Sequence, residues 1–413
     1  MKDTAGIVII GAGIGGLALA LGLHGRGVKS RVYEAAPELK ELGVGITILP
    51  HAMRELAGLG LQDKVVAAGV TNTASAFFNR FGQLVYRELR GLDAGYTYPE
   101  AGVHRGRLHA ILYDAVKVRL GEENVVLNHR CTGVVQDDSG ATILFEQTSS
   151  GAKLPPVRAS IVLACDGINS AIRRQFYPDE ELGFEGINTW RGVARHKPIL
   201  DGHTYIRIGS IKTGKLVIYP IMDDVDGEGT QLVNWTSEVP LFGKPKNDWN
   251  KPGKLEDFLP IYESWRFEWL DVAAFLANSE VILEYPMVDR DPVKRWTFGR
   301  VTLVGDAAHP MYQRGSNGCA QALIDARVLA DLMKSSDDLQ AALRAYEEAR
   351  LEPTTKVVLT NRSMPPDFIN IKVEELTGDA PFDDLDRYIS QDELRELSDR
   401  YKRIAGFGRQ DVM

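Results

Sequence analysis

The feature that most constrains this chain is a short apolar strand that runs directly into a glycine-rich turn and an apolar helix. The strand Ile-Val-Ile-Ile is followed at residues 11–16 by Gly-Ala-Gly-Ile-Gly-Gly, and an almost wholly apolar segment comes next. In such a unit Gly11 permits the tight turn, Gly13 lets the backbone approach a pyrophosphate, and Gly16 lets the helix pack close to the strand. The start of the helix then presents unpaired N–H groups to the phosphates.

An acidic residue completes this pattern. A second strand, residues 31–33, ends at Glu34, whose carboxylate can accept hydrogen bonds from a ribose diol. Glu34 follows Gly16 at close to the roughly 20-residue spacing of the fingerprint. The alternative, a glycine-rich turn in an unrelated fold, is disfavoured because the motif lies between a strand and a helix with the acid in place. The segment therefore predicts a dinucleotide-binding unit.

Length and composition restrict the class of protein. The chain has 413 residues, too many for one ordinary core, so two or more domains are expected. A net charge of −8 argues against nucleic acid or an anionic membrane as the main partner, and no run reaches the roughly 20 apolar residues that span a bilayer. Cys131, Cys165 and Cys319 are far apart and lack metal-ligand spacing. These features predict a cytoplasmic protein with no metal site.

The pattern of strands changes twice along the chain. From about residue 183 to 285, alternating strands separated by Asp and Gly turns replace the parallel-strand pattern, as in an antiparallel sheet with one covered face. The stretch around residues 77–86 has the same pattern, and after residue 300 a parallel strand returns. We expect a discontinuous dinucleotide domain over residues 1–72, 100–182 and 286–350, a β-rich domain over 73–99 and 183–285, and a helical tail over 351–413.

Three further motifs indicate which dinucleotide is bound. They are Cys165-Asp166-Gly167 after a buried strand, Gly305-Asp306 after another, and Gly315-Ser316-Asn317-Gly318 at the start of a long Ala-rich helix. Together with the glycine turn, these ordered motifs make the chain resemble the class A (single-component) flavoprotein aromatic hydroxylases from residue 1 to about 350. Segments 189–193, 285–292 and 316–318 look like the methylphenazine-carboxylate monooxygenase branch of that family.

The resemblance implies an α/β fold: a Rossmann-like FAD-binding domain of the GR2 type, an inserted antiparallel sheet that binds substrate, and C-terminal helices. It also implies cofactor contacts at positions that match the motifs of the family. These are Gly11, Gly13, Ile14, Gly15, Gly16, Glu34, Ala35, Val44, Gly45, Arg105, Cys131, Asp166, Asp306, Gly315, Asn317 and Gly318.

Several of these residues have physical roles that suit a flavin. Asp306, at a strand end, can accept hydrogen bonds from ribityl hydroxyls, and the N–H groups of residues 315–318 can stabilise negative charge at the N1–C2=O edge of reduced flavin. The guanidinium of Arg105 suits phosphate or isoalloxazine contacts; the alternatives are a surface salt bridge, or Arg107 in its place. Cys131 is expected either to contact adenine through its backbone or to pack as a buried cysteine.

Candidates for substrate binding lie in the β-rich region and in the flavin loop. Tyr205, Tyr219 and Trp235 are candidates for stacking a planar substrate, and core packing explains each of them equally well. Arg314 is a candidate for attracting a carboxylated substrate, the alternative being a solvent-facing charge. Gln313 stands where the family usually has proline, so the loop keeps a carbonyl there but loses a fixed φ.

No side chain is assigned a catalytic role. Asp166 is expected to order its turn, and family precedent makes His309 structural. The resemblance implies a monooxygenase that binds FAD, uses NADH or NADPH and O₂, and hydroxylates a small aromatic or heteroaromatic ring through a flavin C4a-hydroperoxide. There is no second GxGxxG, so NAD(P)H is expected to dock transiently.

Two alternatives remain for the activity: an FAD-dependent reductase or dehydrogenase without oxygen insertion, and a non-catalytic flavin-binding protein. The sequence leaves open the aromatic substrate, the choice between NADH and NADPH, and whether the chain is a monomer or a homodimer.

Overall fold

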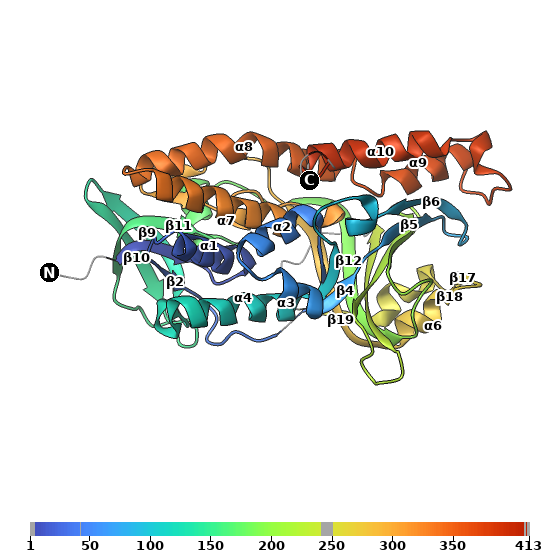
Figure 1. The fold of residues 1–413 in the computed structure, drawn as a ribbon, viewed down its shortest axis with the longest axis horizontal. Helices are drawn as coiled ribbons and strands as arrows, with labels where there is room; N and C mark the ends of the chain where they lie inside the picture. Colours follow the sequence, from blue (N-terminus) through green and yellow to red (C-terminus); the bar gives the residue numbers. More distant parts are fainter. Residues whose placement is uncertain (1–4, 42, 241–250, 409, 411–413) are drawn as a thin grey trace.

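The computed structural model describes residues 5–41, 43–240, 251–408 and 410. Two large β-sheets lie side by side, and the C-terminal helices extend along the same side of both (Figure 1). No helix within these ranges is long and apolar enough to cross a bilayer.

The first sheet is built around the N-terminal strand. In spatial order its strands are β20 (Thr297–Phe298), β21 (Val301–Leu303), β11 (Val157–Ala164), β1 (Ala5–Ile10), β2 (Ser30–Tyr33) and β8 (Val125–Val126), with β10 (Gly140–Glu146) attached to β11 and β9 (Arg130–Asp137) to β10. β1 pairs in parallel with both β11 and β2. Its continuous apolar sequence fits a strand buried on both faces, as the glycine-turn pattern predicts.

Three helices pack together beside this sheet. They are α1 (Ile14–Gly25), α4 (Arg105–Leu120) and α7 (Gly318–Ser335), and α1 contacts both of the others. The shorter helices of this part are α2 (Pro50–Gly58), α3 (Gln62–Ala67) and α5 (Ala171–Phe176). A small sheet with the order β3 (Gly45–Ile48), β7 (Ala101–His104), β4 (Gly69–Thr71) lies between the two large ones and was not predicted.

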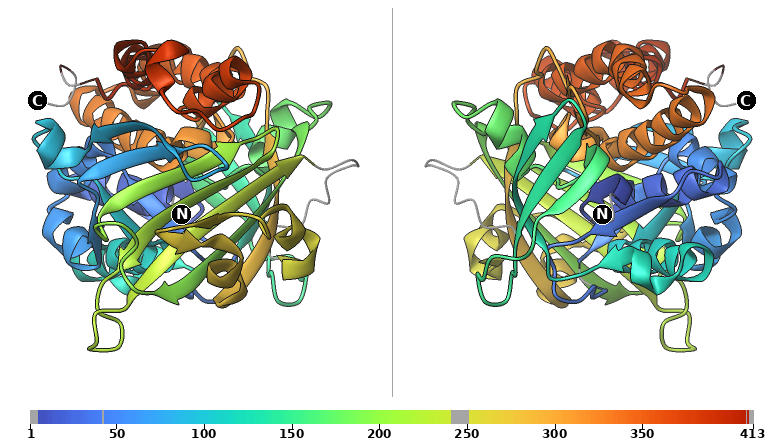
Figure 2. Two further views of the ribbon diagram at one scale, coloured as in Figure 1. Left: turned by 90° about the vertical axis from the view of Figure 1, so that its right-hand side faces the viewer. Right: turned by 90° about the vertical axis from the view of Figure 1, so that its left-hand side faces the viewer.

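The second sheet is antiparallel apart from one strand pair. Its order is β16 (Lys251–Pro252), β19 (Ser279–Asp289), β12 (Gly183–His196), β15 (Gln231–Pro240), β14 (Gly214–Met222), β13 (Thr204–Ser210), β5 (Ala74–Phe78) and β6 (Leu84–Leu89). Because β5 joins in parallel to β13, the prediction that the stretch around residues 77–86 belongs to this sheet is confirmed. Figure 2 shows these strands lying beneath the C-terminal helices.

The expectation that only one face of this sheet would be covered is wrong. Every residue of β13 is buried, and so is almost every residue of β14. One face packs on residues 255–276, which include β17 (Arg266–Phe267), β18 (Leu270–Asp271) and α6 (Val272–Ala277). The opposite face packs on β3 and on the C-terminal region. We call this second face the front face.

The C-terminal helices are α8 (Leu339–Ser363), α9 (Phe368–Thr377) and α10 (Gln391–Ile404). α10 lies within the helical tail predicted over residues 351–413. Its start is fixed by a capping box: the Ser390 hydroxyl accepts from the backbone N–H of Glu393, whose carboxylate accepts from the N–H of Ser390. α7 packs on α8, and α8 on α10, so the tail lies over the glycine-bearing loop that precedes α7.

Candidate cofactor and substrate site

The glycine turn lies at the carboxyl end of β1, and its glycines have different reasons to be glycine. Gly11 has a φ of +100°, and a Cβ there would stand 2.4 Å from the carbonyl oxygen of Cys165. A Cβ at Gly16 would stand 2.0 Å from the carbonyl oxygen of Gly11. The predicted tight turn at Gly11 and the predicted close packing at Gly16 are therefore confirmed.

Gly13 contrasts with its neighbours. It is exposed, and a Cβ there would meet no protein atom within 4 Å. Gly13 caps the N-terminus of α1, which begins at Ile14, and at Gly15 a Cβ would lie 3.3 Å from the Ala322 side chain of α7. The protein thus leaves space beside Gly13, where the helix N-terminus favours an anionic group.

The Glu34 carboxylate accepts hydrogen bonds from the backbone on both sides of it, including the glycine turn. Its Oε2 accepts a hydrogen bond from the backbone N–H of Ala12 (2.6 Å), and its Oε1 accepts from that of Ala36 (2.7 Å), with Ala35 between. An ionised carboxylate has about four acceptor positions. Glu34 is only half-buried, so each oxygen keeps a lone pair for a further donor such as a ribose hydroxyl.

Asp306 is the most available carboxylate near the turn. Its side chain is exposed, and no residue of the described ranges donates a hydrogen bond to it. The surrounding protein nevertheless desolvates it, which raises its pKa, while the charges of His309 and Arg105 act in the opposite direction. A Cβ at Gly318 would lie 3.8 Å from its Oδ1, so Asp306 faces the start of α7.

Arg105 begins α4 and is exposed. Among the residues that the structure describes it has no ion-pair partner, whereas Arg107 pairs with Glu41 at 3.7 Å. The surface salt bridge that was considered for Arg105 is therefore formed by Arg107 instead. Arg105, which acts electrostatically on both Asp306 and Cys319, is the better placed of the two for an anionic cofactor.

Asp166 and His309 have the structural roles expected of them. Asp166 Oδ2 accepts from the backbone N–H of Ala171 (2.9 Å) at the start of α5, while its buried Oδ1 has no hydrogen-bond partner within the described chain. His309 is buried, with Nε2 2.5 Å from Asp325 Oδ2, and Arg350 donates to the other oxygen of Asp325 (2.7 Å). Neither side chain is arranged as a general base.

Three of the other predicted cofactor residues, Cys131, Val44 and Gly45, contact protein side chains. Cys131 is buried in the core of the first sheet, and this burial raises the pKa of its thiol to about 12. Val44 packs against the tyrosines of the front face. The N–H of Gly45 donates to Asn234 Oδ1 (2.7 Å), and a Cβ on Gly45 would stand 2.6 Å from that of Asn234.

Gln313 adopts the backbone angle that proline would impose. Its φ is −69°, and its carbonyl accepts from the N–H of Ser316 (3.3 Å). Replacement of the usual proline therefore leaves the φ at this position unchanged. The carbonyl is used to close the following turn.

Two of the three predicted aromatic residues lie together on the front face. The rings of Tyr205 and Tyr219 stack with centroids 4.9 Å apart and planes 9° from parallel. The guanidinium of Arg207 lies 4.4 Å from the centroid of Tyr205. Val44 packs against this pair, so the stacked tyrosines face the region of the cofactor motifs.

A substrate role for Trp235 does not fit the structure. Its side chain is fully buried on the opposite face, against Phe258, and its indole N–H donates to Ser279 Oγ (2.8 Å). Successive residues of a strand point to opposite faces, so Trp235 lies behind the sheet while its neighbour Asn234 lies on the front face. Trp235 is a core residue.

The alternative of a solvent-facing Arg314 is also wrong. Arg314 is 5% exposed, and its Nε lies 3.7 Å from Glu238 Oε2. Glu238 also pairs with Lys215, whose Nζ is 3.0 Å from Asp367 Oδ2. Arg314 therefore belongs to a buried cluster of charges in which nearby carboxylates balance its own.

Sequence reasoning missed three residues that the fold brings to this region: Arg191, Lys215 and Tyr401. Arg191 and Lys215 have a signal in the sequence, since each is a charged residue inside a strand that is otherwise largely apolar. Tyr401 gives no such signal. Within the described residues no group of three His, Cys, Asp or Glu side chains could hold a metal ion.

The chain is similar to several known proteins. Residues 4–213 match the family described as "FAD binding domain". Phenazine 1,6-dicarboxylic acid hydroxylase PhzS of Lysobacter antibioticus is 39% identical over 361 residues, which cover 86% of this chain and 89% of that protein. 3-Amino-4-hydroxybenzoate 2-monooxygenase PtmB3 of Streptomyces platensis is 30% identical over 370 residues, covering 88% of each.

The fold is shared with solved structures. Klebsiella pneumoniae HpxO complexed with FAD and uric acid superposes with a TM-score of 0.77 at 23% sequence identity, covering 100% of this chain and 97% of that one. At this level of identity the likeness concerns the fold.

Proposed function

This chain belongs to the FAD-dependent aromatic hydroxylases, and from that premise we propose that its substrate is a planar aromatic or heteroaromatic ring that carries a carboxylate. The chain is a monooxygenase with NAD(P)H as electron donor. Per turnover, NAD(P)H, a proton, O₂ and the ring give NAD(P)⁺, water and the hydroxylated ring. FAD supplies the redox and oxygen chemistry when bound, and the protein supplies binding, orientation and exclusion of water.

We propose the following contacts for FAD, in which the available donors and acceptors of the site match its groups. The space at Gly13 and the start of α1 suit the pyrophosphate, and the free lone pairs of Glu34 suit a ribose. The carboxylate of Asp306 suits ribityl hydroxyls, and Arg105 offers a cation. The backbone N–H groups at the start of α7 suit the N1–C2=O edge of the flavin.

The position and charge of Arg191 are the main support for the proposed substrate. It lies on β12 opposite Thr236 of β15, in a row of residues across the front face. The neighbouring row on one side contains Asn234, which accepts a hydrogen bond from Gly45. The neighbouring row on the other side contains Glu238, which lies next to Arg314. Arg191 therefore lies between two rows that contact Gly45 and Arg314, which adjoin positions that the sequence resemblance assigns to the cofactor.

No carboxylate among the described side chains forms an ion pair with Arg191. Arg191 is half-buried, and its Nε donates a long hydrogen bond (3.4 Å) to Thr236 Oγ1. Burial raises the pKa of the neighbouring Tyr219 despite the opposing charge of Arg191, so at neutral pH the tyrosine is a neutral phenol beside a cation. A carboxylate on the substrate would supply the missing charge, and a guanidinium binds it in a bidentate way.

The names of two relatives support this substrate class. PhzS is named for a phenazine dicarboxylic acid, and PtmB3 for a hydroxybenzoate. Both are planar rings with a carboxylate. The stacked pair Tyr205 and Tyr219, next to Arg191, suits a ring of this kind.

The oxygen step can be tested directly with the purified protein. Under anaerobic conditions, we expect NADH or NADPH to bleach the flavin faster when phenazine-1-carboxylate or a hydroxybenzoate is present. Readmitting ¹⁸O₂ should place one labelled oxygen atom in the ring product, as measured by mass spectrometry. Flavin reoxidation without labelled product would favour a reductase, and NAD(P)H consumption that no aromatic acid stimulates would favour a non-catalytic flavoprotein.

The role of Arg191 predicts a selective loss in the Arg191→Gln variant. A charge-assisted hydrogen bond contributes about 1.5–3 kcal/mol, so KM for a carboxylated substrate should rise about 10- to 100-fold. The matching carboxamide should be bound about equally by variant and wild type. Arg195→Gln is the control, because Arg195 lies on the same strand but pairs with Glu280 at the exposed surface. Equal KM values of Arg191→Gln and wild type for the acid would contradict the proposal.

We further infer a cytoplasmic location, which the three free cysteines and the dependence on NAD(P)H support. The assembly proposed is a monomer or a homodimer, which sedimentation at several protein concentrations would distinguish.

A further inference from the structure

The loop before α7 contacts the C-terminal helix α10. We propose that Tyr401 of α10 positions this loop, residues 313–317, for FAD, so that the C-terminal segment acts as a latch on the cofactor site. The inference rests on the contact between this loop and FAD proposed above.

The loop has a conformation that it cannot be expected to keep unaided. Two consecutive residues have a positive φ: Gly315 at +80° and Ser316 at +55°. The left-handed region is unfavourable for a residue with a side chain, and such residues persist where surrounding contacts fix them. The contacts that hold residues 315–317 therefore matter to the geometry at the start of α7.

Tyr401 supplies one of these contacts. Its hydroxyl oxygen lies 1.8 Å from the position that a Cβ on Gly315 would occupy, so the side chain presses directly on the loop backbone. The hydroxyl donates to Asn361 Oδ1 of α8 (2.8 Å) and accepts from Asn317 Nδ2 (2.8 Å). Asn317 Nδ2 also donates to the carbonyl of Gly315 (3.2 Å). One buried hydroxyl thus connects two C-terminal helices to the loop.

The other end of the Asn317 side chain is also fixed by the tail. Asn317 Oδ1 lies 3.1 Å from Nε2 of His51, and the His51 ring stacks on Phe407 with centroids 4.9 Å apart and planes 8° from parallel. The carbonyl of Phe407 in turn accepts from the Tyr96 hydroxyl (2.8 Å). Burial lowers the pKa of His51 to about 3, so it is neutral and can donate from Nε2. Tyr401 and Phe407 therefore hold Asn317 from two sides.

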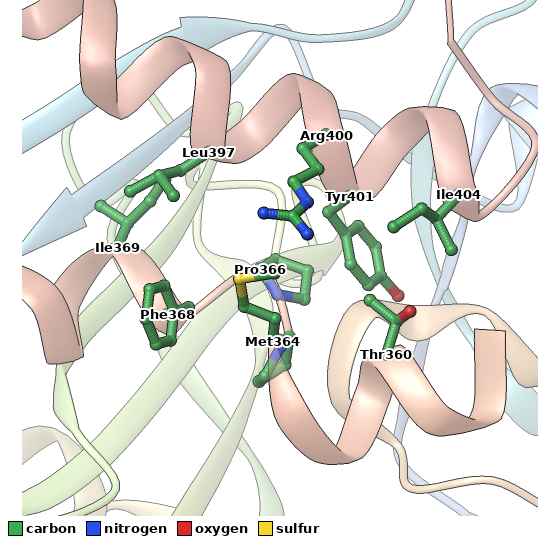
Figure 3. Close-up of a pocket in the computed structure, with 10 residues that line it drawn as sticks. Thr360, Met364, Pro366, Phe368, Ile369, Leu397, Arg400, Tyr401 and Ile404 are labelled. Carbon is green, nitrogen blue, oxygen red and sulfur yellow. The ribbon is translucent and has the colours of Figure 1, made fainter. Parts of the chain in front are cut away.

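The Tyr401 ring lies at the edge of an apolar hollow between α8, α9 and α10 (Figure 3). The ring projects from α10 toward Thr360, with Met364 and Pro366 on another side of the hollow. The ring is held by packing, whereas the link to the loop is made by the hydroxyl. Removing only the hydroxyl, as in Tyr401→Phe, therefore tests the link with little change in packing.

The latch should affect both the affinity for FAD and the electronic state of the bound flavin. The loop carries the N-terminus of α7, whose N–H groups favour negative charge on reduced flavin. A looser loop would hold these donors less well. We therefore expect weaker FAD binding and a more negative flavin reduction potential when the Tyr401 hydroxyl is removed.

The experiment measures both quantities in the full chain. FAD is titrated into apoprotein by fluorescence, and the midpoint potential is measured spectroscopically on the reconstituted protein. Tyr401→Phe should raise the Kd for FAD about tenfold and shift the potential negative, from the loss of buried hydrogen bonds. Tyr388→Phe is the control, because Tyr388 lies in the same region but is 46% exposed. It should match the wild type in both measurements.

A double variant tests whether the bond to Asn317 is the cause. Tyr401→Phe and Asn317→Ala remove the same hydrogen bond, so together they should raise Kd little more than Asn317→Ala does alone. Additive effects would overturn the proposal, as would a Tyr401→Phe protein with the Kd and potential of the wild type.

A variant at the other contact keeps the proposal testable if Tyr401→Phe does not fold, as judged by circular dichroism of the apoprotein. Phe407→Leu removes the ring that stacks on His51 and should also raise the Kd for FAD. An unchanged Kd in Phe407→Leu would overturn the latch. A wild-type protein that binds no FAD would instead overturn the assigned cofactor site.

Discussion

Replacing Gly13 with alanine is expected to weaken FAD binding about 100-fold while the apoprotein remains folded. Gly13 has a φ of −69°, which alanine adopts without strain, and a Cβ there meets no protein atom within 4 Å. The added methyl group would instead occupy the space proposed for the pyrophosphate, next to the N–H groups of α1. A loss of about 2.8 kcal/mol of binding free energy corresponds to 100-fold. Titration of apoprotein with FAD measures it.

Two further glycine variants make this result specific. Gly25→Ala, at the other end of α1, also adds a methyl group in open space and should bind FAD like the wild type. Gly11→Ala should instead unfold or deplete the soluble protein, because its Cβ would collide with the backbone of Cys165 at a positive φ. Normal FAD affinity in Gly13→Ala would show that the pyrophosphate does not lie beside Gly13.

Replacing Lys215 with methionine is expected to lower the free energy of unfolding by about 3–5 kcal/mol at neutral pH. Lys215 Nζ lies 3.0 Å from both Glu238 and Asp367, and all three side chains are buried. Removing one partner of a buried ion pair leaves an uncompensated charge, which costs this much. Urea unfolding followed by circular dichroism measures the change.

The loss of unfolding free energy in Lys215→Met should depend on pH because Asp367 titrates. Burial acts to raise the pKa of Asp367, but the charges of Lys215 and Arg314 outweigh it and hold that pKa below its usual value. In the wild type, the depressed pKa contributes stability above the unfolded-state value of about 3.9, and this stability is lost as pH falls toward the folded-state pKa. Without Lys215, protonation of Asp367 relieves the unpaired charge, so the variant and wild type should converge in acid.

A lysine at the surface is the matched control. Lys212 pairs with Glu375 at 2.8 Å, but both side chains are about half exposed, at 53% and 48%. Lys212→Met should therefore cost at most about 1 kcal/mol. Equal unfolding free energies of the two variants would mean that the buried cluster contributes no more than a surface pair.

The cofactor half of the site could be predicted from the sequence because local chain geometry determines it. A strand, a turn that needs a positive φ at Gly11, a helix packed against it at Gly16 and an acid at the next strand end are all set within about thirty residues. The structure places Glu34 beside the turn, and its Oε2 also accepts from the N–H of Ala12, a contact that the spacing alone did not predict. The helical tail was predicted for the same reason, since a segment such as α10 is a continuous helix.

The substrate face could not be predicted in this way. Both faces of the second sheet are buried, so its strands lack the alternation of polar and apolar residues that reveals which side chains share a face. The sequence therefore grouped Trp235 with Tyr219, although the two lie on opposite faces. The solvent-facing alternative for Arg314 was wrong because its partner, Glu238, is remote in sequence and could not be foreseen.

The sequence by itself determined that this chain binds a dinucleotide and which strand, turn and helix form the start of that site. Only the tertiary structure decided that Arg191 lies on the front face without an ion-pair partner in the part of the chain that the structure describes, and that Tyr401 reaches the loop before α7. The first result depends on backbone conformations and contacts between near neighbours, which residue types specify directly. The second depends on strand pairing and helix packing between residues far apart in the chain, where a side chain acquires its partners only when the fold brings them together.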